Sequence, residues 1–185
     1  MNTTPPSETS AGQPAEIAEI EPVEVIRSFF RSAEIEVEEH DGRFLTNLEL
    51  ENWEVKVFCC GQPHDLVQLI FRLPIKVPVK MRPQAGEFFH RMNFGARRKF
   101  WEMDYNDGEI RCSCYTDTIS APLTESLFSS MVRCLAQMSD RIFPYVMALI
   151  SGKMAPDFAA DQAIAALSAD SDEGDQSETE WTPEN

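Results

Sequence analysis

The sequence has few of the features that mark a membrane, secreted or disulfide-rich protein. No apolar run approaches the roughly 20 residues that a membrane-spanning helix needs. Met1 to Ala15 has neither the basic nor the apolar segment of a secretory signal. The chain has five cysteines, an odd number that does not fit a complete disulfide framework. These absences predict a cytoplasmic protein with reduced thiols.

The cysteines also lack the spacing of a structural metal module. Cys59 and Cys60 are adjacent and would point to opposite faces of a strand, whereas Cys112 and Cys114 would share one face. A metal site at Cys112 and Cys114 is the alternative, but the sequence offers no second pair at the spacing of a zinc module. We therefore expect reduced, partly buried thiols and no metal or other cofactor.

Motifs of familiar catalytic machinery are missing as well. The sequence has no glycine-rich phosphate loop, no Gly-x-Ser-x-Gly and no His-Glu-x-x-His. An enzyme would need a histidine close to a cysteine or a carboxylate, for example His64 beside Cys59, or His90 in its helix. Solvated histidines and carboxylates explain these residues more simply. The sequence therefore predicts a protein that is not an enzyme.

Basic residues are absent from both ends of the chain. Residues 1–26 carry five acidic side chains and residues 154–185 carry nine, without a lysine or arginine in either range. The body between them holds 17 acidic and 16 basic residues, so the formal net charge of −15 belongs almost entirely to the ends. The polar composition of the ends predicts disorder in 1–20 and 169–185. Their acidity disfavours binding to nucleic acid or to anionic membranes.

Hydrophobic periodicity in the body predicts an α+β domain over residues 21–153, with one antiparallel sheet packed by three helices. Asp41-Gly42 and Asn106-Asp107-Gly108 are hairpin signals, because these residues adopt the positive φ that tight turns need. The expected order is α-β-β-β(-β)-α-β-β-α. We expect helices over 22–32, 83–94 and 123–150, and strands over 34–38, 43–50, 53–60, 66–73, 97–105 and 109–115.

A long apolar seam marks the last helix of this domain. Its members recur every three or four residues: Phe128, Met131, Leu135, Met138, Ile142, Tyr145 and Leu149. The seam can face the sheet of the same domain or a second subunit, and the first is favoured. Pro144 lacks an amide hydrogen, so the helix should kink or be rebuilt there. A further short helix, weakly docked, is expected within 154–168.

Several segments, in this order and spacing, resemble one known family. They are the Asp41-Gly42 hairpin, the run Lys76 to Pro83, the helix ending at Met92-Asn93, the strands within Lys99 to Arg111, and the long helix with Asp140, Pro144 and Gly152. Over about residues 22–152 the chain resembles the YbjN-like family of bacterial sensory transduction regulators. The resemblance implies a fold similar to type III secretion chaperones, often dimeric, and a regulatory or chaperone-like role without an established active site.

One cluster of basic residues precedes and enters the strand after the second predicted helix. It comprises Arg82, Arg91, Arg97, Arg98 and Lys99. This cluster can bind an anion or an acidic partner, or it can be the positive charge that a helix C-terminus favours. A third reading places the acidic C-terminal segment across it. Trp181 has almost no apolar neighbour in that segment and could anchor a short binding motif.

These observations predict a non-enzymatic regulatory or protein-binding module. Twelve phenylalanines and eight methionines are more large apolar residues than one thin core obviously needs. We expect an apolar surface of the sheet or helices to engage a protein partner or a second copy in a homodimer. A chaperone for one dedicated client is the alternative and requires a contiguous apolar groove. A small-molecule-binding or enzymatic domain is less favoured and requires an enclosed pocket.

Overall fold

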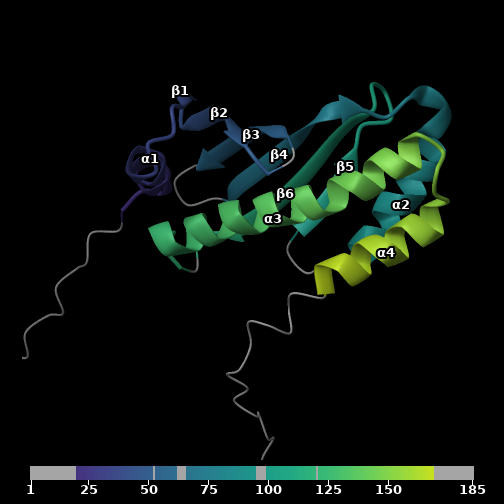
Figure 1. Cartoon of the computed structure of the whole chain (residues 1–185). Helices are drawn as coiled ribbons and strands as arrows, with labels where there is room; N and C mark the ends of the chain where they lie inside the picture. Colours follow the sequence, from purple (N-terminus) through teal and green to yellow (C-terminus); the bar gives the residue numbers. More distant parts are fainter. Residues whose placement is uncertain (1–19, 52, 62–65, 95–98, 120, 169–185) are drawn as a thin grey trace, which may run out of the picture.

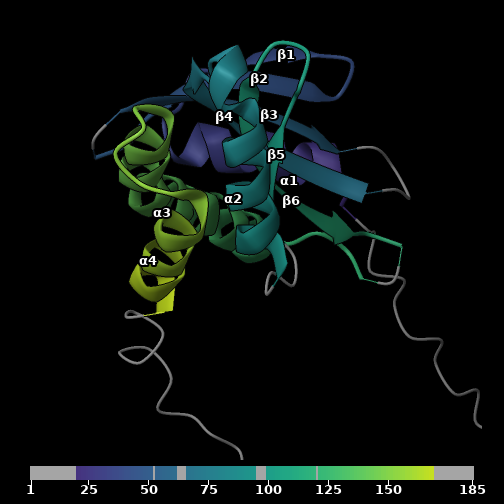
Figure 2. The same cartoon turned by 90° about the vertical axis from the view of Figure 1, so that its right-hand side faces the viewer.

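The computed structural model describes residues 20–51, 53–61, 66–94, 99–119 and 121–168, and shows one antiparallel sheet with helices gathered on one side of it (Figures 1 and 2). The sheet has six strands in the order β1-β2-β3-β4-β6-β5. The strands are β1 (Glu38–His40), β2 (Arg43–Glu49), β3 (Glu54–Gly61), β4 (Leu66–Lys76), β5 (Lys99–Met103) and β6 (Glu109–Asp117). The helices are α1 (Pro22–Ser32), the 3-10 turn η1 (Val79–Met81), α2 (Arg82–Phe94), α3 (Glu125–Ile150) and α4 (Pro156–Ser168). The predicted α+β class and element order are confirmed.

Tight turns connect the hairpins at the two predicted places. Asp41 and Gly42 have φ values of 48° and 70°, and Gly108 has 80°. In the second turn, carboxylate oxygens of Asp104 and Asp107 accept hydrogen bonds from the amides of Asn106 and Glu109 at 2.7 and 2.9 Å. The turn is therefore held by its own side chains, as expected where aspartate and asparagine flank a glycine.

The first strand is shorter than predicted. The alternation of Ile35 and Val37 with glutamates suggested a strand beginning near residue 34, but β1 begins only at Glu38. The amide of Ile35 instead donates to the carbonyl of Phe30 at 2.9 Å, and Glu34 has a positive φ of 55°. The residues after α1 thus cap the end of that helix, and the chain joins the sheet only at Glu38.

Helix α3 lies along the sheet and buries most of its predicted seam in the protein's own core. Its buried residues are Phe128, Met131, Leu135, Ser139, Ile142, Val146 and Leu149. The Oγ1 atom of Thr124 caps its start by accepting from the amide of Leu127 at 3.1 Å. The helix is continuous through Pro144, so of the two predicted outcomes, a kink or a rebuilt segment, the rebuilt segment is wrong. The proline ring lies on the exposed side of α3 and displaces no core side chain.

Helix α4 is docked more firmly than the sequence suggested. It lies beside α2 (Figures 1 and 2) and buries Ala159, Ala160 and Ala163 completely. Alanines allow close approach of helix backbones without producing a strong apolar stripe, which explains why the sequence indicated weak docking.

Two further predictions concern the ends and the membrane. No helix among the described residues is long and apolar enough to cross a membrane. The predicted disorder of 1–20 and 169–185 falls, apart from residue 20, outside the described residues.

Candidate binding face of the sheet

One face of the sheet carries no helix among the described residues, and we call it the open face (Figure 2). Its opposite face meets the helices through residues such as Phe44, Val57, Phe71 and Cys112, which are at most 1% exposed. Side chains alternate between the two faces along each strand, so the open face carries the intervening residues. Antiparallel sheets often expose one face to solvent, and that face usually carries polar residues. Apolar residues on an exposed face therefore call for an explanation.

A row of mainly apolar residues crosses the open face from β2 to β5. We call it the apolar row: Leu45, Phe58, Ile70, Ser113 and Phe100, each in register with the next. Ile70 is only 8% exposed, whereas Phe100 at the edge is 39% exposed. The hydroxyl of Ser113 donates to the carboxylate of Glu102 at 2.8 Å, so the one polar member of the row is satisfied.

A second row, two residues further along each strand, is positively charged. Lys56, Arg72 and Arg111 are in register on β3, β4 and β6, and we call them the cationic row. Like charges directly opposite one another repel. Glu109 offsets part of this repulsion by accepting from Arg72 at 3.0 Å and from Arg111 at 2.5 Å. Within the described part of the chain, Lys56 has no ion-pair partner, so its charge is uncompensated at short range.

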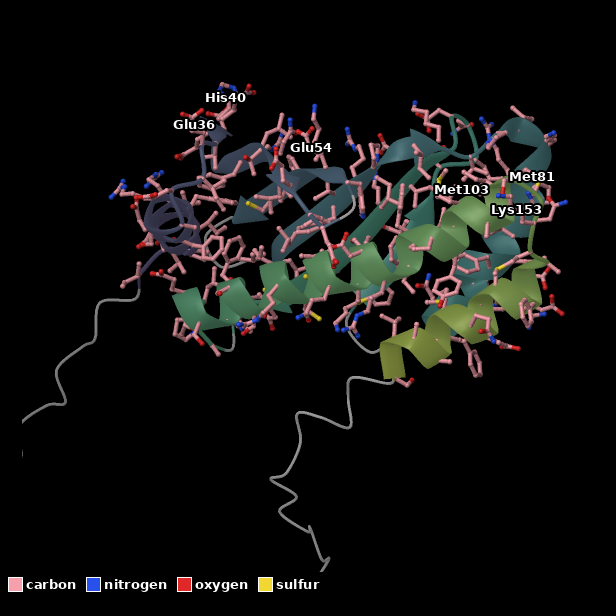
Figure 3. The ribbon with its side chains drawn as sticks, in the orientation of Figure 1. Glu36, His40, Glu54, Met81, Met103 and Lys153 are labelled. Carbon is pink, nitrogen blue, oxygen red and sulfur yellow. The ribbon has the colours of Figure 1, made fainter. Side chains whose placement is uncertain are left out.

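Two shallow hollows flank Lys56 on the open face, with volumes of about 410 and 440 Å³. They share Asn47 and Lys56 in their linings. Glu54 lines the first and Glu36 the second, and Figure 3 shows both along the margin of the molecule opposite α3 and α4. Charged and polar residues are the majority in both linings, although Leu73, Pro74 and Ile75 add apolar surface to the first, so neither hollow is the contiguous apolar groove that a client-holding chaperone requires.

Polar and aromatic groups border the apolar row on its other side. The amide of Gln68 donates to the hydroxyl of Tyr115 at 3.0 Å. The Tyr115 ring lies 6.2 Å from that of Phe100. Cys60 lies in register with Gln68 on this side, whereas Cys59 is buried on the helix side, as the alternation predicted.

In the structure, Arg82 and Arg91 of the predicted basic cluster already have partners within the protein. Arg82 donates to the carbonyls of Val77, Tyr105 and Asn106 at 3.3, 2.7 and 3.1 Å, and so fixes the β5–β6 turn to the start of α2. Arg91 pairs with Glu87 one helical turn away at 2.8 Å. Lys99 is in register with Cys114, on the side of the sheet that faces the helices. Arg97 and Arg98 lie outside the described residues, so the five-residue site stays a prediction.

Sequence reasoning missed the cationic row. Its three members are far apart along the chain, and only the register of β3, β4 and β6 brings them together. Within each strand, the alternation of apolar and polar residues does place the basic residue on the face opposite the core.

The thiols and histidines form no catalytic arrangement among the described residues. Burial raises the pKa of Cys59 and Cys112 strongly and that of Cys114 to about 12, which keeps these thiols protonated and poorly nucleophilic. His90 is exposed on α2 and has no hydrogen-bond partner in the described part of the chain, while His64 lies outside it. No group of three histidines, cysteines or carboxylates among the described residues could hold a metal ion.

Comparison with known proteins finds similarity at the level of solved structures. No protein-family model and no curated protein matches the chain. Solved structures of similar fold include YbjN and a type III secretion chaperone complex. YbjN, a proposed transcription regulator from E. coli, has 10% sequence identity and a TM-score of 0.48, with 65% of this chain and 87% of that chain covered. A chain of the ExoT–SpcS complex from Pseudomonas aeruginosa has 12% identity and a TM-score of 0.42, with 65% and 97% covered.

These neighbours are the two groups that the sequence resemblance names. At identities of 10% and 12% the likeness concerns the fold alone. The roles of individual residues must therefore be argued from the geometry of the open face itself.

Proposed function

We propose that the protein is a non-enzymatic, regulatory protein-binding module whose partner docks on the open face of the sheet. The observation that carries this proposal is the apolar row beside the cationic row, on a face that no described helix covers. Aromatic and aliphatic side chains supply most of the affinity at protein interfaces, and arginines beside them supply orientation and specificity. The charged lining of the hollows favours selective recognition of a partner over the general holding of an unfolded client.

A matched pair of substitutions tests the face. Phe100 on the open face and Met147 on α3 are both 39% exposed, so each can lose its side chain without opening the core. The full chain is used as bait in a lysate of its native host, and the captured proteins are quantified by mass spectrometry. One partner protein should be recovered in a fixed ratio to the bait. We expect Phe100→Ser to weaken its recovery roughly ten-fold, as loss of an interface anchor does, and Met147→Ser to leave it unchanged.

Two results would contradict the proposal. One is equal recovery with both variants, and the other is loss with Met147→Ser alone, which would move the interface to α3. The predicted homodimer is a separate part of the proposal, and sedimentation of the full chain over a range of concentrations tests it. A mass of one chain at all concentrations would remove the homodimer while leaving the open face as a site for a different partner.

A further inference from the structure

We propose that the acidic segment 169–185 of the same chain docks on the open face, with Trp181 against the apolar row and acidic side chains beside Lys56. The segment would then compete with the protein partner, a consequence that rests on the proposed function above. The docking itself does not depend on that function. It follows from the composition of the segment, the chemistry of the face and the reach of the chain.

The composition of the segment complements the two rows of the open face. Residues 169–185 carry seven acidic side chains, no basic ones, and Trp181 as their one large apolar residue. The open face presents an apolar row that can take one aromatic ring, beside the cationic row, in which Arg72 and Arg111 share Glu109 and Lys56 has no ion-pair partner among the described residues. Glu178 and Glu180 precede Trp181 closely, so a ring seated on the apolar row brings carboxylates near Lys56.

Several other cations of the structure are already engaged. Arg82 and Arg91 already have oxygen partners, and Arg27 pairs with Glu24 and Glu39. Helix α4 carries Asp157 and Asp161 close to Arg91, which already pairs with Glu87. An acidic segment leaving α4 therefore meets like charges at that helix, whereas Lys56 on the open face has no ion-pair partner among the described residues.

The chain is long enough to reach the open face. Trp181 is the thirteenth residue after Ser168, the end of α4, and extended chain spans up to about 43 Å over that length. Helix α4 packs on α2, which packs on the edge strand β5. From β5 to β3 the sheet is three strand spacings wide, roughly 14 Å. The segment can thus pass the β5 edge and still lay Trp181 across the apolar row.

Photo-crosslinking in the full chain tests this placement. Trp181 is replaced by p-benzoylphenylalanine, the protein is irradiated at low concentration, and the crosslinked peptides are mapped by mass spectrometry. We expect intramolecular crosslinks to β3, β4 and β5, with a yield that falls as salt is raised from 0.05 to about 0.5 M because exposed charges are screened. Crosslinks confined to the helices would overturn the proposal.

Two charge reversals provide the matched comparison. Lys56 and Lys153 are both exposed lysines, and Figure 3 shows Lys153 beyond the end of α3, away from the open face. We expect Lys56→Glu to lower the crosslink yield roughly five-fold, equivalent to about 1 kcal/mol, and Lys153→Glu to leave it unchanged. Equal yields in both variants would overturn the docking mode. Crosslinks between molecules that increase with protein concentration would also overturn it and would assign the face to a second copy.

A partner assay separates this inference from the proposed function. If both hold, Trp181→Ser should increase partner recovery by the full chain, and Phe100→Ser should reduce it. If the crosslinks map to the open face while Phe100→Ser leaves partner recovery intact, the docking stands and the proposed partner site is wrong. If the crosslinks miss the face while Phe100→Ser abolishes recovery, the partner site stands and the docking is wrong.

Discussion

At the scale of single residues, two glycines show how the same backbone conformation can have different structural consequences. Gly108 and Gly152 both have positive φ, at 80° and 73°. A Cβ atom on Gly108 would lie 2.3 Å from the carbonyl oxygen of Val77, whereas one on Gly152 would meet nothing within 4 Å. The amide of Val77 also donates to the carbonyl of Gly108 at 2.8 Å, so the two segments cannot separate freely.

We therefore predict unequal costs for the same substitution. Gly152→Ala should lower the free energy of unfolding by about 1–2 kcal/mol, the cost of a side chain in the left-handed region. Gly108→Ala should lower the free energy of unfolding by this amount and by roughly 1–3 kcal/mol more, because its methyl group overlaps Val77. Urea unfolding followed by circular dichroism measures both. Equal losses would show that the β5–β6 turn relaxes away from Val77 and that the contact is not constraining.

At the scale of elements, an asparagine side chain takes the place of a neighbouring strand at the edge of the sheet. The Nδ2 atom of Asn93 donates to the carbonyl of Trp101 at 2.8 Å, and the Trp101 amide donates to Oδ1 of Asn93 at 2.8 Å. Strand β5 is an edge strand, whose free backbone groups would otherwise invite another strand. Asn93 lies near the end of α2, and its side chain thus ties this helix to β5.

We predict that Asn93→Asp destabilises the protein in a pH-dependent way. The ionised carboxylate can still accept from the Trp101 amide, but it cannot donate to the carbonyl and repels it, at a cost of about 1–3 kcal/mol at pH 7. Below the pKa of the introduced carboxyl group the cost should shrink, because the protonated form donates. Denaturation at pH 7 and near pH 4 measures the change relative to the parent chain.

Gln84→Glu is the control for this substitution, because Gln84 is an exposed amide on the same helix. It should change the stability by less than about 0.5 kcal/mol at either pH. A loss for Asn93→Asp that is the same at both pH values would mean that the lost packing, not the lost donor, is responsible.

The elements that sequence could predict are those specified locally. Helix α1 and both hairpins were located from periodicity and from turn residues such as Gly42 and Gly108, because these signals act over a few neighbouring positions. The docking of α4 was underestimated, since buried alanines give little apolar signal. The cationic row was not foreseen at all, because it depends on strand register between segments far apart in the chain.

At the scale of the whole molecule, the protein has an apolar core and two ends of the chain that carry most of its excess negative charge. The described core is closed around apolar residues and three buried thiols, while most of the excess acidity lies in 1–26 and 154–185. Ion pairs such as Arg72–Glu109 and Lys76–Asp107 are partly exposed and contribute little to stability individually. The pH dependence of global stability on the alkaline side should therefore be governed largely by the buried thiols.

The sign of this dependence follows from the pKa shifts of the thiols. Burial raises the pKa of Cys59, Cys112 and Cys114 above the value of 9.0 for an exposed thiol. The thiols ionise in the unfolded chain above pH 9 while they stay neutral in the folded chain. Their contribution is fully present below pH 9 and is lost as the pH rises toward the folded pKa, about 12 for Cys114. Each buried thiol can remove up to about 1.4 kcal/mol per pH unit in this window.

We predict that Cys112→Val flattens this alkaline decline. Urea unfolding at pH 8, 9 and 10 should show a steep loss of stability for the parent chain and a decline about one third smaller for the variant, since one of three thiols is gone. Val57→Ala, in the same layer of the core, should lower stability by about 1–3 kcal/mol at every pH without changing the slope. An unchanged slope for Cys112→Val would mean that the thiol reaches solvent in the native state, and the core would then be open where the sheet meets α3.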